Sequence, residues 1–107
     1  MTTFEESLKH LPKVDHIERI ELSDARGMPA GTIENKPAES GSLAVYNYLL
    51  GKYGHINAAA AGDGLQLYGE HTEDAKKHPG RHPNIDRLLQ LLLTGSFFAG
   101  RIVKRPA

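Results

Sequence analysis

The sequence predicts a single α+β domain in which helices cover a small, mainly antiparallel sheet of about three strands. Two short segments with strand character flank a turn signal near the N-terminal end, and a third lies near the C-terminal end. Segments with helical periodicity fill the region between them. A chain of 107 residues is the usual size of one domain, which we place over residues 1–107. The expected order is α-β-β-α-α-α-β, with three to four helices.

The first third of the chain predicts a short helix and a hairpin. A helix is expected over residues 3–10, because apolar side chains recur there at helical spacing and Pro12 would end it. The segment "DARG" then predicts a turn, with Asp24 at its first position and Gly27 at its last. A second strand, roughly Met28–Asn35, should therefore return antiparallel to the first.

The middle of the chain predicts two longer helices. The segment "ESGSLAVYNYLLGKYG" is amphipathic, and Ser40 or Ser42 could cap it. Its apolar arc contains Leu43, Val45, Tyr46, Leu49, Leu50 and Tyr53. A second helix is expected over Asn57–Lys77, capped by its first residue. Within it, Gly64 falls on the buried side, which predicts a close approach to a neighbouring element; a break near Gly62–Gly64 is the alternative.

A proline-rich corner, "HPGRHPNID", ends this helix and begins the next one. Proline is well tolerated at the first helical position and asparagine is a good cap, so Pro83 or Asn84 should start a helix that runs to Gly95. The final segment "SFFAGRIVK" has the β-branched and aromatic content of a strand. It must pair with the early hairpin if it is not to remain an unpaired edge.

Composition excludes several functional classes. The chain has no cysteine, which excludes a disulfide framework, a thiolate metal site and a cysteine nucleophile. No apolar run approaches the ~20 residues that span a bilayer, and the first residues lack the order of a signal peptide. We therefore expect a cytoplasmic protein without a membrane partner.

Charge is balanced overall but unevenly distributed. Thirteen basic residues match thirteen acidic ones, so nucleic acid is not an expected partner. Residues 1–24 are mostly acidic and residues 76–107 mostly basic. These two segments could neutralise each other across the fold. Alternatively, the basic segment could form a face for phosphates or for an acidic partner.

Four side chains form a candidate metal site, namely His71, Asp74, His78 and His82. Imidazole and carboxylate groups are ligands that zinc accepts, so zinc is the metal this set would suit. However, His71 and His78 are separated by about 10 Å along a continuous helix, and no HExxH motif is present. The alternative places both of these histidines inside the apolar stripe as packed rings. Our expectation for cofactors is none.

The corner also provides a candidate anion site, formed by Arg81, His82 and Asn84. The amides at a helix N-terminus bind phosphate or carboxylate, and adjacent cationic side chains strengthen that binding. The alternative is a purely structural corner, in which Asp86 complements the helix dipole.

No catalytic signature is present: GxSxG, P-loop and dinucleotide-binding patterns are all absent. The leading hypothesis is a small non-catalytic binding or interaction module, whose partner is an unknown protein or a small anionic ligand. The alternative is an anion- or metal-binding module, or a small enzyme, that uses the His/Asp/Arg cluster of residues 71–86.

Three features together resemble a known family: the segments "GSLAVYNYLL" and "LYGEHTEDAKKHPGRHPNID", and the length of the chain. They resemble an uncharacterised family of small bacterial proteins, a domain of unknown function marked by an HPG[RK]HPNID segment. The resemblance extends from about Phe4 to Ile102. It implies a bacterial source, and it implies no activity, substrate or cofactor for any residue.

Overall fold

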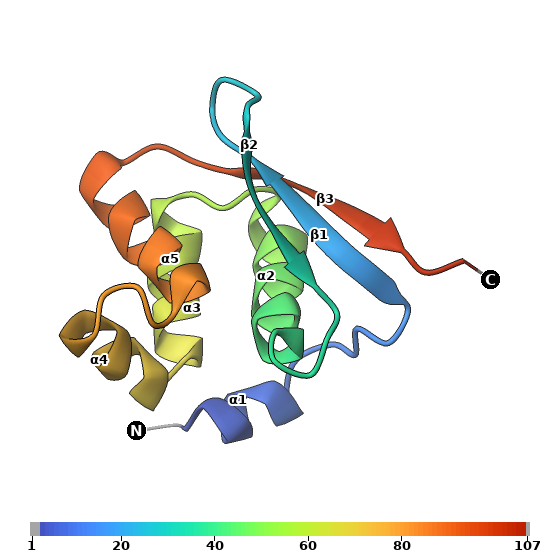
Figure 1. Cartoon of the computed structure of the whole chain (residues 1–107), viewed down its shortest axis with the longest axis horizontal. Coiled ribbons are helices and arrows are strands. Elements are labelled where there is room, and N and C mark those ends of the chain that lie inside the picture. Colours follow the sequence, from blue (N-terminus) through green and yellow to red (C-terminus); the bar gives the residue numbers. More distant parts are fainter. Residues whose placement is uncertain (1–2, 107) are drawn as a thin grey trace.

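The computed structural model describes residues 3–106 and has the predicted α+β class (Figure 1). Its elements, in chain order, are α1 (Phe4–Lys9), β1 (Ile17–Ser23), β2 (Pro29–Glu34), α2 (Ser40–Tyr53), α3 (Ala58–Leu67), α4 (Glu70–Lys77), α5 (Pro83–Thr94) and β3 (Ala99–Lys104). The order of helices and strands follows the prediction. The described part contains five helices rather than three to four, because the predicted helix over residues 57–77 is divided into two.

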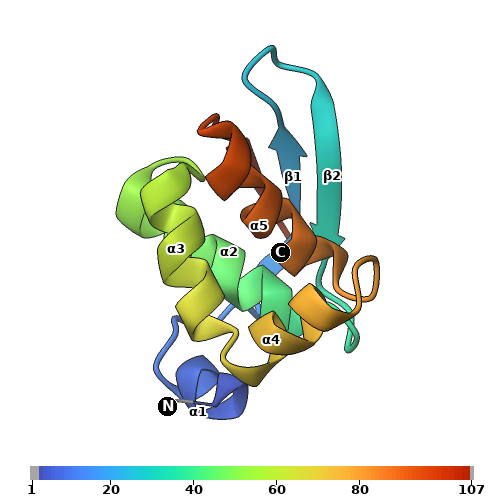
Figure 2. The same ribbon diagram turned by 90° about the vertical axis from the view of Figure 1, so that its left-hand side faces the viewer.

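The three strands form one antiparallel sheet in the order β2-β1-β3. Ile20 at the centre of β1 lies opposite Ile33 of β2 and Ile102 of β3. The last strand therefore pairs with the early hairpin, as predicted. The helices gather on one side of the sheet (Figure 2), so one sheet face is buried and the other carries polar side chains.

The predicted turn of the hairpin is confirmed. The amide of Gly27 donates to the carbonyl oxygen of Asp24 at 2.9 Å, and Gly27 has a φ of 81°. The side chain of Asp24 accepts hydrogen bonds from the amides of Arg26 and Met28. Pro29 is the first residue of β2, an edge strand, where the missing N–H is best tolerated.

The hydrophobic core lies between α2 and the sheet and continues to α3 and α5. Most of the predicted apolar arc of α2 is buried, and only Tyr53 remains partly exposed. The largest fully buried side chains are Tyr46, Ile17, Ile20, Ile33, Leu43, Leu49, Ile56, Ile85, Leu88, Leu91 and Val45. They come from strands and helices distant in the chain, so the helical layer and the sheet share a single core.

Gly64 is the point of closest approach between α3 and its neighbours. A Cβ atom built on Gly64 would lie 2.9 Å from Cδ1 of Leu49 and 2.9 Å from Cδ1 of Leu88. The predicted close approach at this glycine is therefore confirmed. It allows α3 to pack against α2 and α5 at once.

The prediction of one helix over residues 57–77 is wrong. Asn57 caps α3 as predicted, since its side chain accepts from the amide of Ala60 at 2.8 Å. The helix stops at Leu67 rather than breaking near Gly62–Gly64, and Gly69 adopts a φ of 57°. Because this backbone conformation is disfavoured for L-residues, glycine permits the change of direction. The chain then continues as α4, which lies beside the start of α5 (Figure 2).

Candidate functional site

A cleft of about 620 Å³ lies where the N-terminal ends of α2 and α5 approach each other. Its other walls come from α1, from β2 and from the corner between α3 and α4. Pockets of about 300–1,000 Å³ are typical of small-molecule sites. The cleft thus has the size of a binding site, and its chemistry depends on the groups that line it.

The three residues of the predicted anion site all line this cleft. Arg81 and His82 lie in the corner before α5, and Asn84 lies in its first turn. His71 of the predicted metal set lines the cleft as well. The sequence prediction missed Arg87, which also lines it. The position of Arg87 in the sequence could have indicated this, because a residue three positions after Asn84 on a helix projects from the same helix face.

Arg87 is held in place by contacts from three elements. Its Nη1 donates to Oδ1 of Asn84 at 2.9 Å and to the hydroxyl of Tyr46 at 3.2 Å. Its guanidinium carbon lies 5.7 Å from the centre of the Tyr46 ring. A Cβ atom on Gly31 of β2 would lie 2.5 Å from Nη2 of Arg87, so the guanidinium occupies space that a side chain at position 31 would take.

The charge of Arg87 has no carboxylate partner within residues 3–106. Its hydrogen bonds go to neutral groups, an amide oxygen and a phenol. A partly buried cation without a counter-charge attracts anions more strongly than an exposed and paired one. Arg87 therefore gives the cleft a net positive character.

Tyr46 connects the core to the first turn of α5. Its hydroxyl donates to the carbonyl oxygen of Asn84 at 2.6 Å. Burial raises the pKa of Tyr46 to about 12, although the nearby Arg87 opposes the shift. The phenol therefore stays protonated at neutral pH and acts as a fixed hydrogen-bonding group below the cleft.

The N-terminus of α2 lacks the predicted serine cap. Its N-cap residue is Glu39, whose side chain makes no capping hydrogen bond, and the first turn contains no acidic residue. The Ser42 hydroxyl is instead hydrogen-bonded to the Tyr68 hydroxyl at 2.8 Å. The amides of Gly41 and Ser42 donate to no acceptor within residues 3–106, whereas that of Leu43 donates to Glu39. Two amides and the positive end of the helix dipole thus remain at the cleft.

The N-terminus of α5 has a similar arrangement. His82 is its N-cap residue and makes no capping hydrogen bond, and Pro83 occupies the first turn. The amide of Asn84 donates to no acceptor within the described residues, while those of Ile85 and Asp86 donate to the His82 carbonyl oxygen. Both helix starts therefore present amides where the cationic side chains are found.

Asp74 organises the residues beside the cleft. Its Oδ2 lies 2.6 Å from Nε2 of His82 and 3.5 Å from Nη1 of Arg81, and its Oδ1 lies 3.8 Å from Nε2 of His78. The hydrogen bond from His82 lowers the pKa of Asp74, and the charge of Arg81 lowers it further. The ionised carboxylate holds His82 and Arg81 next to the start of α5.

The candidate metal residues lie near one another but differ in their surroundings. The ring centres of His71 and His82 are 5.6 Å apart, and His71 packs edge-on against Phe4 at 5.2 Å. The prediction that His71 is a packed ring is thus confirmed. The same prediction for His78 is wrong, because its side chain is 52% exposed at the end of α4. No group of three histidine or acidic side chains in residues 3–106 is placed to hold a metal ion.

The acidic side chains near the cleft are few. Among the described residues that line it, Glu39 is the acidic one, whereas Arg81 and Arg87 are basic and two further residues are histidines. The carboxylate of Asp86 in the first turn of α5 is occupied by the amide of Gly80 at 2.9 Å. The cleft therefore favours an anionic ligand over a cationic one.

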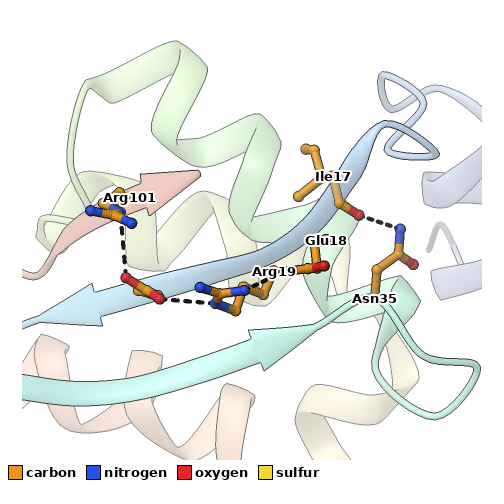
Figure 3. A network of polar contacts seen from close by, with 6 residues as sticks. Ile17, Glu18, Arg19, Asn35 and Arg101 are labelled. Atoms are coloured by element: carbon orange, nitrogen blue, oxygen red, sulfur yellow. Dashed lines mark hydrogen bonds and ion pairs between the residues drawn. The ribbon is translucent and has the colours of Figure 1, made fainter. Parts of the chain in front are cut away.

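The opposite face of the sheet carries a separate polar network, which has a structural role (Figure 3). Glu21 of β1 accepts from Nε of Arg19 at 2.9 Å and pairs with Nε of Arg101 on β3 at 3.4 Å. Arg19 also pairs with Glu18. The hydrogen bond from Arg19 lowers the pKa of Glu21. Glu21 belongs to the acidic segment of residues 1–24, and Arg101 belongs to the basic segment of residues 76–107. At the Glu21–Arg101 ion pair the two segments neutralise each other, as the first interpretation of the charge distribution predicts.

The fold and the cleft together define a small α+β domain with a polar pocket at two helix N-termini. The family described as "Uncharacterized protein conserved in bacteria (DUF2322)" matches residues 4–101, and the chain belongs to this family. The resemblance seen in the sequence is thereby confirmed. Neither the curated proteins nor the solved structures include a significant match to this chain. No helix within residues 3–106 combines the length and the apolar character needed to cross a bilayer.

Proposed function

We propose that the protein is a non-catalytic cytoplasmic module that binds a small anionic ligand in the cleft between α2 and α5. The observation that carries the proposal is the guanidinium of Arg87, which lines the cleft without a carboxylate partner among the described residues. Arg81 and His82 lie in the same wall. Cationic side chains and helix N-termini together are the usual components of anion sites in proteins.

Preorganisation supports this proposal. Tyr46 and Asn84 both accept hydrogen bonds from Nη1 of Arg87, and Asp74 is hydrogen-bonded to His82. Side chains that are already ordered lose little conformational entropy when a ligand binds, so a larger part of the interaction energy contributes to affinity.

The direct test is a titration of the ¹⁵N-labelled full chain with inorganic phosphate, followed by amide NMR shifts at low ionic strength. We expect saturable shifts at the amides of Gly41, Ser42 and Asn84. The amide of Ala25 in the hairpin turn serves as the internal reference. Absence of saturable shifts at the three cleft amides would overturn the proposal.

A matched pair of variants tests the role of Arg87. Arg87→Met removes the cation from the cleft, and Arg26→Met makes the same chemical change in the exposed hairpin turn. We expect phosphate to raise the melting temperature of the wild type and of Arg26→Met but not of Arg87→Met. A ligand at 100 times its Kd stabilises a protein by about 2.7 kcal/mol. A parallel melt with zinc tests the metal alternative, which predicts stabilisation by zinc and no dependence on Arg87.

A further inference from the structure

We infer that the ligand of this cleft is a small organic phosphate monoester whose alcohol part is apolar or aromatic. This inference rests on the proposed anion-binding function and specifies its ligand. It follows from two properties of the cleft: donor groups come from more than one helix, and apolar side chains of α1 line the same cleft.

The donors suit a phosphate better than a carboxylate. Three amides that donate to no acceptor in the described part of the chain lie here: those of Gly41 and Ser42 belong to α2, and that of Asn84 belongs to α5. The guanidinium of Arg87 adds further N–H groups between these helices. A carboxylate has two oxygens in one plane, whereas a phosphate monoester has three terminal oxygens arranged around phosphorus and carries a charge of about −1.5 to −2 at pH 7. Donors from separate helices match the oxygen arrangement of a phosphate monoester.

One wall of the cleft is apolar and is formed by α1. Phe4 and Leu8 line the cleft, and a Cβ atom built on Gly41 at the start of α2 would lie 2.8 Å from Cζ of Phe4 and 3.7 Å from Cδ1 of Leu8. The ring of Phe4 stacks on Tyr68 at 5.2 Å and meets the edge of His71 at 5.2 Å. These contacts fix an aromatic wall beside the helix N-terminus, where an apolar ligand group would be shielded from water.

The position of α1 is set by a contact distant in sequence. The amide of Phe4 donates to Oε1 of Glu70 at 2.9 Å, and this hydrogen bond lowers the pKa of Glu70. The carboxylate of Glu70 therefore ties the beginning of α1 to the beginning of α4. The apolar wall formed by α1 is thus fixed relative to α4, and a ligand that contacts both this wall and Arg87 must have an apolar part and an anionic part.

The size of the cleft agrees with such a ligand. A volume of about 620 Å³ is within the range of sites for small organic molecules, about 300–1,000 Å³. Inorganic phosphate alone would fill only a small part of this volume. Phe4 and Leu8 also line the cleft, and their side chains offer contact area but no hydrogen-bond donor.

Isothermal titration calorimetry of the full chain with three probes tests the inference: inorganic phosphate, phenyl phosphate and benzoate. We expect phenyl phosphate to bind about tenfold or more tightly than inorganic phosphate, because its ring is buried against α1. We expect benzoate, which keeps the ring but replaces the phosphate, to bind more weakly than phenyl phosphate by a similar factor.

The outcomes separate this inference from the proposed function. If no probe binds, both are wrong. If inorganic phosphate binds and phenyl phosphate binds no more tightly, the anion site stands and the inferred ligand class is wrong. If benzoate equals phenyl phosphate, the preference for phosphate is wrong.

Variants locate the apolar part of the ligand. Phe4→Ala should reduce the affinity for phenyl phosphate by a much larger factor than the affinity for inorganic phosphate. Phe97→Ala is the control, because that aromatic side chain is 40% exposed and does not line the cleft. Leu8→Ala, at a partly buried position, provides the same test should Phe4→Ala fail to fold. The inference would be contradicted if Phe4→Ala or Leu8→Ala reduced the affinities for phenyl phosphate and inorganic phosphate equally, or reduced neither.

Discussion

Nε2 of His82 and Oδ2 of Asp74 lie 2.6 Å apart, and this hydrogen bond joins α4 to the N-cap residue of α5. The two residues are eight positions apart in a region where the chain changes direction twice. The contact fixes the corner "HPGRHPNID" against the body of the domain. The carboxylate of Asp74 also neutralises part of the positive charge that Arg81 brings to the cleft.

Replacing Asp74 with asparagine should make the stability less dependent on acid pH. The pKa of Asp74 is lowered in the folded state, first by the hydrogen bond from His82. Because the pKa of Asp74 is lower in the folded state than the unfolded-state pKa of 3.8, the ionised carboxylate stabilises the fold at pH values above 3.8. This stabilisation is lost as the pH falls through the folded-state pKa. The difference in melting temperature between wild type and Asp74→Asn should thus shrink as the pH falls below about 4.

The matched control for this measurement is Asp15→Asn, because Asp15 is exposed and forms no ion pair with the described residues. If Asp74→Asn and Asp15→Asn change the dependence of melting temperature on acid pH equally, the contact between Asp74 and His82 does not cause that dependence.

Replacing Gly64 and Gly62 with alanine, one at a time, should change the free energy of unfolding in opposite directions. A Cβ atom at Gly64 would meet Leu49 and Leu88 at 2.9 Å, so Gly64→Ala should destabilise the protein by about 1–3 kcal/mol through overpacking. A Cβ atom at Gly62 would meet nothing within 4 Å, and alanine favours the helix there by about 0.5–1 kcal/mol. Urea unfolding measures both. Equal effects at the two positions would show that helix propensity, and not packing, governs α3.

Phenylalanine at Tyr46 should weaken the fold and the anion site together. The variant removes the hydrogen bond to the carbonyl oxygen of Asn84 and the one from Arg87, and a lost hydrogen bond costs about 1 kcal/mol of folding free energy. Because Arg87 then loses one of its supports, phosphate affinity should fall as well. Chemical denaturation and calorimetry measure the two effects.

The control is Tyr53→Phe. The Tyr53 hydroxyl also makes one side-chain hydrogen bond, to Asp63 at 3.0 Å, but that contact lies outside the cleft. Unchanged phosphate affinity in Tyr46→Phe would mean that Arg87 does not need this support.

Most of the fold could be predicted from local sequence patterns. The apolar arc of α2, the turn at Asp24 and the pairing of the last strand each depend on periodicity or turn chemistry that a short segment contains. The division of the helix over residues 57–77 could not. Gly62, Gly64 and Gly69 all weaken a helix by about the same amount, so propensity alone does not identify which one ends it.

The site could be predicted only in part, for a related reason. Arg81, His82 and Asn84 were identified because helix N-termini have general chemistry. Arg87 depends on Gly31 and Tyr46, which are distant in the chain and meet it only in the folded protein. The uncapped start of α2 was missed for the same kind of reason, because Ser42 contacts Tyr68 across the cleft wall instead of its own helix.

The turn at Gly80 affects how related chains should be compared. Helix α4 ends at Lys77, and the chain passes through Gly80, which has a φ of 95°, before α5 begins at Pro83. Because the chain turns between the two helices, the imidazole of His71 and the carboxylate of Asp74 both lie beside His82. A sequence search for this neighbourhood should therefore require the glycine itself, and should treat the number of residues on either side of it as two independent distances.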